Sequence, residues 1–537
     1  MTKPFRVLIS DSMSPLAAEI LAASPRIEVD VRTGLTPGDL KSIIGDYHGL
    51  LVRSATKVTA EIIEAASQLE IIGRAGIGVD NIDIPAASRR GILVENAPSG
   101  NSVTTAEHAI CLLLSLARHI PQATASMKAS KWEKNKFEGS EIFGKTLGVI
   151  GLGNIGRIAA DRAQGLHMKV IGHDPFIGKE AAERLGVELV SVDELLERSD
   201  FITIHTPLTD TTRGLLDARA LARTKKGVLI VNAARGGIID EGALVEALNS
   251  GHVGGAALDV FVKEPPPADH PLIGHPKVIC TPHLGASTDE AQQKVAVEVA
   301  EQFVAYAERG EVRNALNVAS VSSESRVKLA PWQELARALG AVVGQLTPTG
   351  EGFIDALTVE AVGEPGELGS AAVVSSTLIG LLKHFIGVPI NEINAPVIAK
   401  DRGLEVTEAK RNRDRDFASA VIVTARAGKS TLTARGTLYH LGDRVEARIV
   451  QIDEFVVEVN PRGRLLAVVN RDQPGVIGQV GTLLGSAGIN VASLSVGQDK
   501  DKGTALALWN VEGQIGAELL ERIRSVESID SALLIEL

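Results

Sequence analysis

The chain has 537 residues, which is too many for one hydrophobic core. At roughly 150 residues per domain, this length predicts three or four domains. A net charge of −11 argues against a nucleic-acid partner, although a few clustered arginines can still hold a small anion. Only two cysteines are present, and neither a signal-peptide pattern nor an apolar run of ~20 residues occurs, so we expect a cytoplasmic protein with no membrane span, disulfide framework or metal site.

Short apolar runs alternate with helical patterns through the first half of the chain, which predicts doubly wound parallel sheets. A helical pattern at 103–120 is expected to bridge two lobes. A second helical pattern at 288–308, ending before Gly310, is expected to complete the first lobe. The first sheet is expected to hold strands at 7–9, 49–52, 69–72 and 92–94, and the second sheet strands at 146–150, 169–172, 201–205, 228–232, 255–258 and 278–280.

The second half of the chain differs in character. The polar stretch 320–325 indicates a linker, and 332–346 has the pattern of an amphipathic helix. The segment to about residue 459 mixes strands with a helical run near 375–385 and shows no catalytic motif. From about 464 the order strand, helix, strand, strand, helix, strand predicts a ferredoxin-like βαββαβ unit.

A glycine-rich motif, Gly151-Leu152-Gly153-Asn154-Ile155-Gly156, follows a predicted strand and opens a helix. The motif alone is weak, but in this position the glycines let the backbone approach a pyrophosphate at a helix N-terminus. Asp174 lies about 18 residues after Gly156, where an acid binds ribose hydroxyls and repels a 2′-phosphate. This spacing favours NAD over NADP, while a solvated aspartate before Pro175 is the alternative.

Three chemically useful residues follow the ends of later predicted strands: Arg235, Glu264 and His283. Oxidation of a 2-hydroxy acid needs a base for the hydroxyl proton, and histidine suits that role. A carboxylate beside a histidine can orient it and raise its pKa, and arginine can hold a substrate carboxylate. Spacing alone leaves structural roles for all three open, because His270 and His275 lie close to His283 in the sequence.

The glycine motif, the Ala234-to-Gly237 segment and the stretches 259–266 and 281–288 resemble the D-isomer-specific 2-hydroxyacid dehydrogenase family. Segments 51–59, 73–83, 131–133 and 144–148 resemble its phosphoglycerate dehydrogenase branch. The middle segment, which includes Asn394-Ala395-Pro396, is similar to the intervening domain of long forms, and the last segment to an ACT domain.

This resemblance implies an enzyme that uses NAD to oxidise 3-phospho-D-glycerate to 3-phosphohydroxypyruvate, the first step of L-serine biosynthesis. Arg235 would bind the substrate carboxylate and polarise the keto oxygen, His283 would be the general acid/base, and Glu264 its partner. The implied NAD-binding residues are Gly151, Gly153, Asn154, Ile155, Gly156, Asp174, Thr206 and Asp259. The implied substrate-binding residues are Arg53, Ser54, Arg74, Gly76 and Lys134, the last reaching the neighbouring subunit's site.

The last unit carries Asn470-Arg471-Asp472-Gln473-Pro474-Gly475 and, further on, Asn490. By resemblance, Asn470, Asp472 and Asn490 would bind a small amino acid, implied to be L-serine, across a dimer interface. Alternatively the domain only holds subunits together. We assign no binding residues to the middle segment, and we expect a homodimer or homotetramer.

We therefore expect an α/β protein with two Rossmann-like doubly wound lobes, an intervening α/β domain and a ferredoxin-like ACT domain. The expected boundaries are 1–98 with 286–316 for the substrate-binding lobe, 99–285 for the NAD-binding lobe, 317–460 for the intervening domain and 464–537 for the ACT domain. Two other functions remain open: another D-2-hydroxyacid dehydrogenase, acting on glyoxylate, lactate or 2-hydroxyglutarate, and a non-catalytic NAD-sensing protein.

Overall fold

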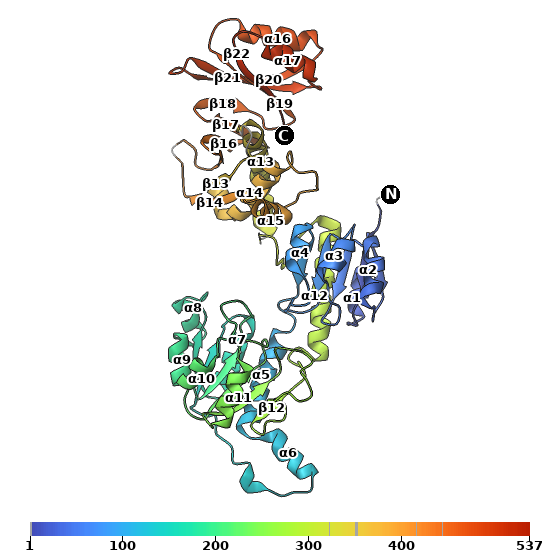
Figure 1. Ribbon diagram of the computed structural model, residues 1–537, viewed down its shortest axis with the longest axis vertical. Coiled ribbons are helices and arrows are strands. Elements are labelled where there is room, and N and C mark those ends of the chain that lie inside the picture. Colours follow the sequence, from blue (N-terminus) through green and yellow to red (C-terminus); the bar gives the residue numbers. More distant parts are fainter. Residues whose placement is uncertain (1–2, 320, 322, 349–352, 415, 443) are drawn as a thin grey trace.

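The computed structural model describes residues 3–319, 321, 323–348, 353–414, 416–442 and 444–537. These residues form four sheets, each with its own helices, and the four units follow one another along an elongated molecule (Figure 1). The second sheet in the chain lies at one end and the C-terminal sheet at the other, with the first and third sheets between them (Figure 1).

The first sheet is parallel, with strand order β2-β1-β3-β4-β5. Its strands are β1 (Phe5–Ile9), β2 (Ile27–Val31), β3 (Gly49–Val52), β4 (Ile71–Arg74) and β5 (Leu93–Asn96), and its helices α1 (Leu16–Ala23), α2 (Pro37–Ile43), α3 (Ala60–Ala65) and α4 (Ile84–Arg89). Sequence analysis missed β2. This edge strand reads Ile-Glu-Val-Asp-Val and lacks the continuous apolar run that marks the central strands.

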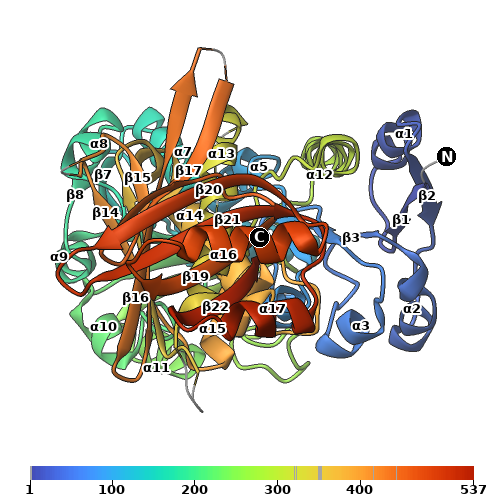
Figure 2. The same cartoon turned by 90° about the horizontal axis from the view of Figure 1, so that it is seen from above.

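Helix α12 (Asp289–Arg309) follows the last strand of the second sheet and packs beside α1 on the first sheet (Figure 2). Phe303 on α12 is completely buried against two strand glycines. A Cβ atom on Gly49 would lie 2.8 Å from the Phe303 ring, and one on Gly73 would lie 2.3 Å from it. These glycines therefore make room for the helix. As predicted, α12 ends at a glycine, Gly310, which has φ +62°.

The second sheet is also parallel, with strand order β12-β11-β10-β9-β6-β7-β8. Its strands are β6 (Thr146–Ile150), β7 (Lys169–His173), β8 (Glu188–Leu189), β9 (Phe201–Ile204), β10 (Val228–Asn232), β11 (Val253–Leu258) and β12 (Val278–Cys280). The helices around it are α5 (Ser102–Ala117), α7 (Asn154–Gly165), α8 (Lys179–Arg184), α9 (Val192–Arg198), α10 (Ala218–Arg223) and α11 (Glu241–Asn249).

The prediction of one continuous helix over 103–120 is wrong at its C-terminal end. Helix α5 ends at Ala117, and His119, at φ 51°, turns the chain into a separate helix α6 (Ile120–Lys128). The left-handed conformation of a non-glycine residue breaks the helix where the sequence pattern runs on. Helix α6 and the segment after it project from the end of the second lobe (Figure 1).

The third unit has the sheet order β14-β13-β15-β16-β17-β18. Its strands are β13 (Ala356–Val362), β14 (Glu405–Arg411), β15 (Ala420–Ala427), β16 (Ser430–Leu441), β17 (Arg444–Ile452) and β18 (Phe455–Val459), and its helices α13 (Ser323–Leu346), α14 (Glu364–Leu382) and α15 (Asn394–Asp401). The long β16–β17 hairpin extends beyond the rest of the sheet (Figure 2).

The predicted linker 320–325 is only partly a linker. Ser320 and Ser322 lie outside the described residues, but α13 already begins at Ser323. An i,i+4 ion pair of Glu324 with Lys328, 3.6 Å between Oε1 and Nζ, lies in this first part of the helix. Polar composition predicted a loop because this helix start carries few apolar residues.

Helix α14 is long and apolar enough to cross a membrane, and it is the one described helix that passes this test. However, 67% of its most apolar window is buried inside the protein, mainly against α13. It has the burial of a core helix.

The C-terminal unit consists of β19 (Arg464–Arg471), α16 (Val476–Ser486), β20 (Asn490–Asp499), β21 (Thr504–Glu512), α17 (Ala517–Arg524) and β22 (Ile529–Glu536). The sheet order β20-β21-β19-β22 confirms the predicted βαββαβ fold. One face of this sheet packs under α16 and α17. Residues of the other face, including Leu465 and Leu508, join the hydrophobic core of the third unit, so the two units share one core.

A buried carboxyl lies where β5 meets the segment that leaves the first lobe. Glu95 is fully buried, its Oε1 accepts from Arg313 N–H at 2.7 Å, and its Oε2 has no partner among the described residues. Burial raises the pKa of Glu95 from the usual 4.5 to about 8, against the opposing effect of Arg313. Glu95 is therefore protonated in the folded protein at neutral pH.

We expect Glu95→Gln to make the free energy of unfolding less dependent on pH. Between pH 4.5 and about 8 the folded wild type binds a proton that the unfolded chain releases. The contribution of Glu95 to the free energy of unfolding should therefore be greatest below pH 4.5. It should fall by up to about 1.4 kcal/mol per pH unit between pH 4.5 and about 8. Melting temperatures of both proteins measured across this window test the prediction, and parallel curves would contradict it.

Candidate active site

The three candidate catalytic residues follow three neighbouring strands. Arg235 comes after β10, Glu264 after β11 and His283 after β12, and these strands are adjacent in the second sheet. The carboxyl ends of parallel strands lie at one edge of a sheet, which is where doubly wound folds bind ligands. The fold therefore brings together residues that lie far apart in the sequence.

Glu264 and His283 are in direct contact. The distance from His283 Nδ1 to Glu264 Oε2 is 2.7 Å, and Glu264 Oε1 accepts from the Phe261 N–H at 3.0 Å. Partial burial opposes ionisation of Glu264, but these hydrogen bonds and the charges of His283 and Arg235 outweigh it, so the pKa of Glu264 is lowered. An ionised Glu264 accepts the Nδ1 proton of His283 and leaves Nε2 free to face a substrate.

Asp259 holds the loop that carries His283. Its Oδ1 accepts from Thr281 Oγ1 at 2.5 Å and from Leu284 N–H at 2.7 Å, and its Oδ2 accepts from Gly285 N–H at 2.8 Å. The His283 N–H donates to the Asp259 carbonyl at 3.0 Å. Asp259 is almost completely buried, so this loop is anchored at the end of β11 from within the fold. The predicted contact of Asp259 with nicotinamide stays a prediction.

Sequence analysis missed His108, which belongs to the same network. His108 lies on α5, and its Nε2 is 3.3 Å from both Thr281 Oγ1 and Asp259 Oδ1. Burial opposes ionisation of Asp259, but hydrogen bonds, first among them that from His108, lower the pKa of Asp259. A histidine within the helical pattern 103–120 was the available signal, but its partners are distant in the sequence.

Arg235 contacts the first lobe. Its Nε donates to Asp80 Oδ2 at 2.9 Å and its Nη1 to the Ala234 carbonyl at 2.7 Å. A Cβ atom on Gly78 would lie 1.6 Å from Arg235 Nη2, so the glycine leaves room for the guanidinium. Both N–H groups of Nη2 and one of Nη1 remain, enough for a bidentate carboxylate. Asp80 was not predicted from the sequence.

Two further arginines of the first lobe lie near Arg235. Arg74 ends β4, and its buried Nε has no partner among the described residues. Burial, followed by repulsion from Arg235 and Arg53, lowers the pKa of Arg74 to about 10, so it remains charged at neutral pH. Three guanidinium groups that repel one another indicate a binding site for an anion.

The backbone around the predicted substrate residues is fixed by buried polar groups. Asp11 Oδ2 accepts from the Arg53 N–H at 2.6 Å, and Arg53 Nη1 donates to the Ser12 carbonyl at 3.0 Å. Ser54 follows Arg53 in the exposed loop after β3. Gly76 has φ +149°, and a Cβ atom there would lie 1.8 Å from Arg74 Nη1, so both its conformation and its contact require glycine.

The glycine loop after β6 fits a dinucleotide. A Cβ atom on Gly156 would lie 1.9 Å from the Gly151 carbonyl oxygen, and one on Gly151 would lie 2.7 Å from the His205 carbonyl oxygen. Gly153 has open space beside it and begins α7 without a side-chain cap. The first N–H groups of α7 are therefore accessible to a pyrophosphate.

Asp174 stands at the end of β7 beside this loop. Its Oδ2 accepts from the Leu152 N–H at 2.8 Å and its Oδ1 from the Phe176 N–H at 2.9 Å. These bonds orient the carboxylate and leave acceptor capacity for ribose hydroxyls. Asn154 and Ile155 lie in the first turn of α7, and Thr206 is half-buried after β9. All the predicted NAD residues except Asp259 thus lie along the glycine loop and the ends of β7 and β9.

Comparison with known proteins identifies the family. The profiles for "D-isomer specific 2-hydroxyacid dehydrogenase, NAD binding domain", "D-3-phosphoglycerate dehydrogenase intervening domain" and "ACT domain" match residues 110–285, 328–453 and 464–527. The D-3-phosphoglycerate dehydrogenase of Synechocystis sp. is 43% identical over 533 residues, covering 99% of this chain and 95% of that protein. The one from Bacillus subtilis is 40% identical over 534 residues, covering 99% and 100%. The chain belongs to the D-3-phosphoglycerate dehydrogenase family.

Solved structures agree with this family's fold. A D-lactate dehydrogenase from Aquifex aeolicus, complexed with NAD and lactic acid, superposes with a TM-score of 0.52 and 26% identity, covering 58% of this chain and 98% of that chain. The predicted fold class is confirmed, and this family member is an NAD-dependent oxidoreductase.

Lys134, the last predicted substrate-binding residue, lies far from Arg53, Ser54, Arg74 and Gly76 in this chain. It belongs to a short 3₁₀ turn (Lys134–Lys136) in the projecting segment after α6. Its exposed side chain makes no hydrogen bond or ion pair with any described residue. Trp132 nearby is 81% exposed. One subunit alone therefore does not bring Lys134 to Arg74 and Arg53.

The predicted effector residues of the ACT domain are not adjacent in one chain. Asn470 pairs with Ala505 near one end of the C-terminal sheet, whereas Asn490 pairs with Glu512 near the other end. Asp472 follows β19 and is exposed, and its N–H donates to the Gly503 carbonyl at 3.0 Å. A site that uses both Asn470 and Asn490 needs a second copy of the domain.

Proposed function

We propose that this protein oxidises the C2 hydroxyl of 3-phospho-D-glycerate to the ketone of 3-phosphohydroxypyruvate, with NAD as hydride acceptor, as the first step of L-serine biosynthesis. This proposal rests on a glutamate–histidine dyad together with a cluster of three arginines where the first two lobes meet. A substrate with both a carboxylate and a phosphate matches that much positive charge better than lactate or glyoxylate.

In the proposed mechanism His283 Nε2 takes the proton from the C2 hydroxyl. Glu264 holds the other ring nitrogen and stabilises the imidazolium that forms. Arg235 binds the substrate carboxylate and polarises the C2 oxygen, while Arg53 and Arg74 bind the phosphate. The glycine loop, Asp174 and Thr206 would hold NAD, whose nicotinamide would supply the acceptor for the hydride from C2. In the reverse direction His283 returns the proton to the ketone oxygen.

The direct experiment follows NADH formation from 3-phospho-D-glycerate at alkaline pH with a trap for the ketone product. Turnover at least tenfold more efficient than with D-lactate, D-glycerate or 2-hydroxyglutarate would support the proposal. A preference for an unphosphorylated 2-hydroxy acid would contradict the proposed substrate but would be compatible with the proposed mechanism. Absence of turnover with tight NAD binding would favour the NAD-sensing alternative.

We expect Glu264→Gln to lower kcat/KM by about 10²-fold in both the oxidation and the reduction direction. The glutamine keeps an oxygen near His283 but removes the negative charge that stabilises the imidazolium formed when His283 takes the substrate proton. The KM for NAD should stay unchanged, because Glu264 is not among the residues proposed to bind NAD. Measurement of kcat/KM in both directions tests this, and values within about threefold of wild type would contradict it.

We propose that the protein acts as a homodimer or homotetramer in which Lys134 completes the neighbouring subunit's site. The exposed Trp132 and Met127 of the projecting segment support a contact surface there. A mixture of Lys134→Ala and His283→Ala subunits tests it. If Lys134 acts on the neighbour, mixed dimers contain one complete site and exceed the activity of the Lys134→Ala protein. Activity that only averages the two parents would oppose the proposal.

We propose that Asn470 and Asp472 of one ACT domain and Asn490 of a second bind L-serine as an effector. The opposite placement of these residues in one sheet supports a site between two copies. Calorimetric titration with L-serine, repeated with Asp472→Ala, is the test. Binding that the substitution leaves unchanged would oppose this site, and the ACT domain would then serve assembly alone.

We also propose the domain boundaries given above and a cytoplasmic location. The chain crosses between the first two sheets after β5 and again before α12, which supports the discontinuous first lobe. Limited proteolysis should then cut near residue 317 before it cuts near 462, because the third and fourth units share a core. Earlier cleavage near 462 would contradict this division.

A further inference from the structure

A positively charged cavity lies at the amino ends of the strands of the second sheet, whereas the candidate active site lies at their carboxyl ends. A cavity of about 310 Å³ opens below the amino ends of β6, β9, β10 and β11, beside the C-terminus of α5. Four lysines from three separate segments line it: Lys145, Lys225, Lys226 and Lys277. Among the described residues that line it, Asp200 is the one acid.

Asp200 does not balance this charge, because its carboxylate is already engaged. Its Oδ1 accepts from Lys225 Nζ at 3.0 Å and its Oδ2 from the Thr146 N–H at 2.8 Å. Burial opposes ionisation of Asp200, but these bonds and the charges of Lys225 and Lys145 lower its pKa. One of the four ammonium groups is thus neutralised by a carboxylate.

The other three lysines have no acidic partner among the described residues. Lys277 is half-buried, and its Nζ donates to the Leu248 carbonyl at the end of α11, at 2.9 Å. Lys145 and Lys226 are exposed at the cavity rim and form no ion pair with any described residue. Ammonium groups held around one cavity repel one another. An anion bound between them would offset this electrostatic repulsion.

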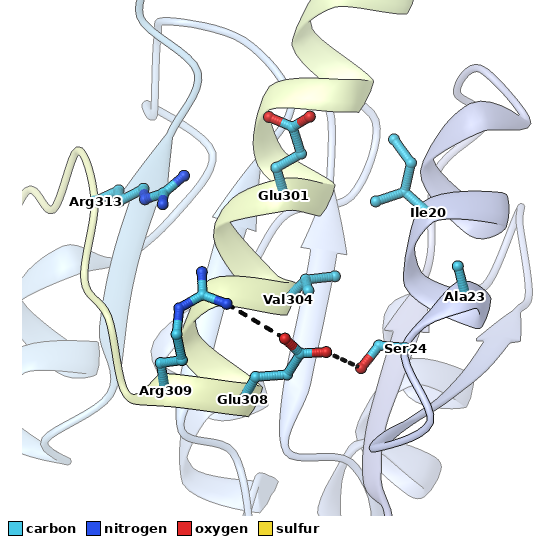
Figure 3. Close-up of a pocket in the computed structure, with 8 residues that line it drawn as sticks. All are labelled: Ile20, Ala23, Ser24, Glu301, Val304, Glu308, Arg309 and Arg313. Atoms are coloured by element: carbon cyan, nitrogen blue, oxygen red, sulfur yellow. Dashed lines mark hydrogen bonds and ion pairs between the residues drawn. The ribbon is translucent and has the colours of Figure 1, made fainter.

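The groove between α1 and α12 shows the contrasting case (Figure 3). Two glutamates and two arginines line it, Glu301, Glu308, Arg309 and Arg313, so its charges balance in number. Arg309 Nη1 lies 3.3 Å from Glu308 Oε2, and Glu308 Oε1 accepts from Ser24 Oγ at 2.7 Å. The described residues of that groove therefore carry no excess charge of one sign that would select an ion.

We propose that the cavity lined by Lys145, Lys226 and Lys277 is a second anion site that binds a small phosphate-bearing molecule. Its volume is at the lower end of the range for ligand pockets, which suits a pyrophosphate or a small phosphate monoester. Lysine side chains bind phosphate as adjustable point charges. Asp200, held in place by Thr146, orients Lys225 at the edge of the site.

The test is calorimetric titration of the full-length protein with inorganic pyrophosphate, performed with and without saturating 3-phospho-D-glycerate and NAD. The double variant Lys145→Gln/Lys226→Gln is compared with Lys179→Gln/Lys500→Gln, a pair of exposed lysines that lie away from the cavity. Removal of two charged contacts should weaken binding at the cavity at least about tenfold. Turnover of 3-phospho-D-glycerate, measured separately, should stay within about twofold in both variants.

Pyrophosphate binding that persists under saturating substrate, and that only the Lys145/Lys226 pair weakens, would support the site. Orthophosphate and glycerol 2-phosphate, titrated in the same way, distinguish a free inorganic anion from a phosphate monoester as the preferred ligand. Equal weakening in both variants, or loss of all binding when the active site is filled, would overturn the proposal. In that case the lysines would serve only to complement the C-terminal ends of α5 and α11.

Discussion

His283→Ala should lower kcat for 3-phospho-D-glycerate oxidation by about 10²- to 10⁴-fold, the usual contribution of a positioned general base. NAD affinity should not change, because His283 lies after β12 whereas the glycine loop lies after β6. Steady-state NADH formation gives the rate, and quenching of protein fluorescence by NADH gives cofactor affinity.

A second histidine of the same segment provides a control. His275 lies before β12, at the far end of that strand, and its Nδ1 accepts from the Lys277 N–H at 3.2 Å. We expect His275→Ala to keep turnover within a few-fold of wild type, with some loss of thermal stability. Near-normal turnover in His283→Ala would show that another group accepts the proton and would remove the dyad from the mechanism.

Arg235→Gln should lower kcat/KM for 3-phospho-D-glycerate by about 10²- to 10⁴-fold. A bidentate carboxylate contact comprises two charge-assisted hydrogen bonds, each worth about 1.5–3 kcal/mol. Arg235→Lys should recover only part of this loss, because an ammonium group cannot present two parallel N–H bonds. Substitution also removes the contact of Asp80 with Arg235, since Arg235 Nε donates to Asp80 Oδ2 at 2.9 Å.

The measurement is the separate determination of kcat and of KM for substrate and for NAD. We expect the KM for 3-phospho-D-glycerate to rise and that for NAD to stay constant. Arg219→Gln is the matched control, because Arg219 is an exposed arginine of α10 in the same lobe. An Arg235→Gln protein with altered NAD affinity and unchanged substrate affinity would contradict the assignment.

Local patterns were sufficient for the central strands and the glycine loop. The runs 146–150 and 228–232 are apolar because β6 and β10 are buried on both faces, and the structure has them at these same residues. Gly151 and Gly156 are required by backbone contacts within one strand–turn–helix unit, so their spacing is visible in the sequence. The edge strands β2 and β8 were missed, because half-exposed or very short strands lack a continuous apolar run.

The sequence by itself therefore determined the α/β fold class and the place of the glycine-rich loop, because these depend on short-range patterns. Arg235, Glu264 and His283 became candidates through the family resemblance, since their spacing alone left structural roles open. Only the tertiary structure decided what surrounds them. Asp80, His108 and the anchoring role of Asp259 depend on contacts between segments distant in the chain. The same holds for the core shared by the third and fourth units, since hydrophobic periodicity shows that a face is buried but not which neighbour covers it.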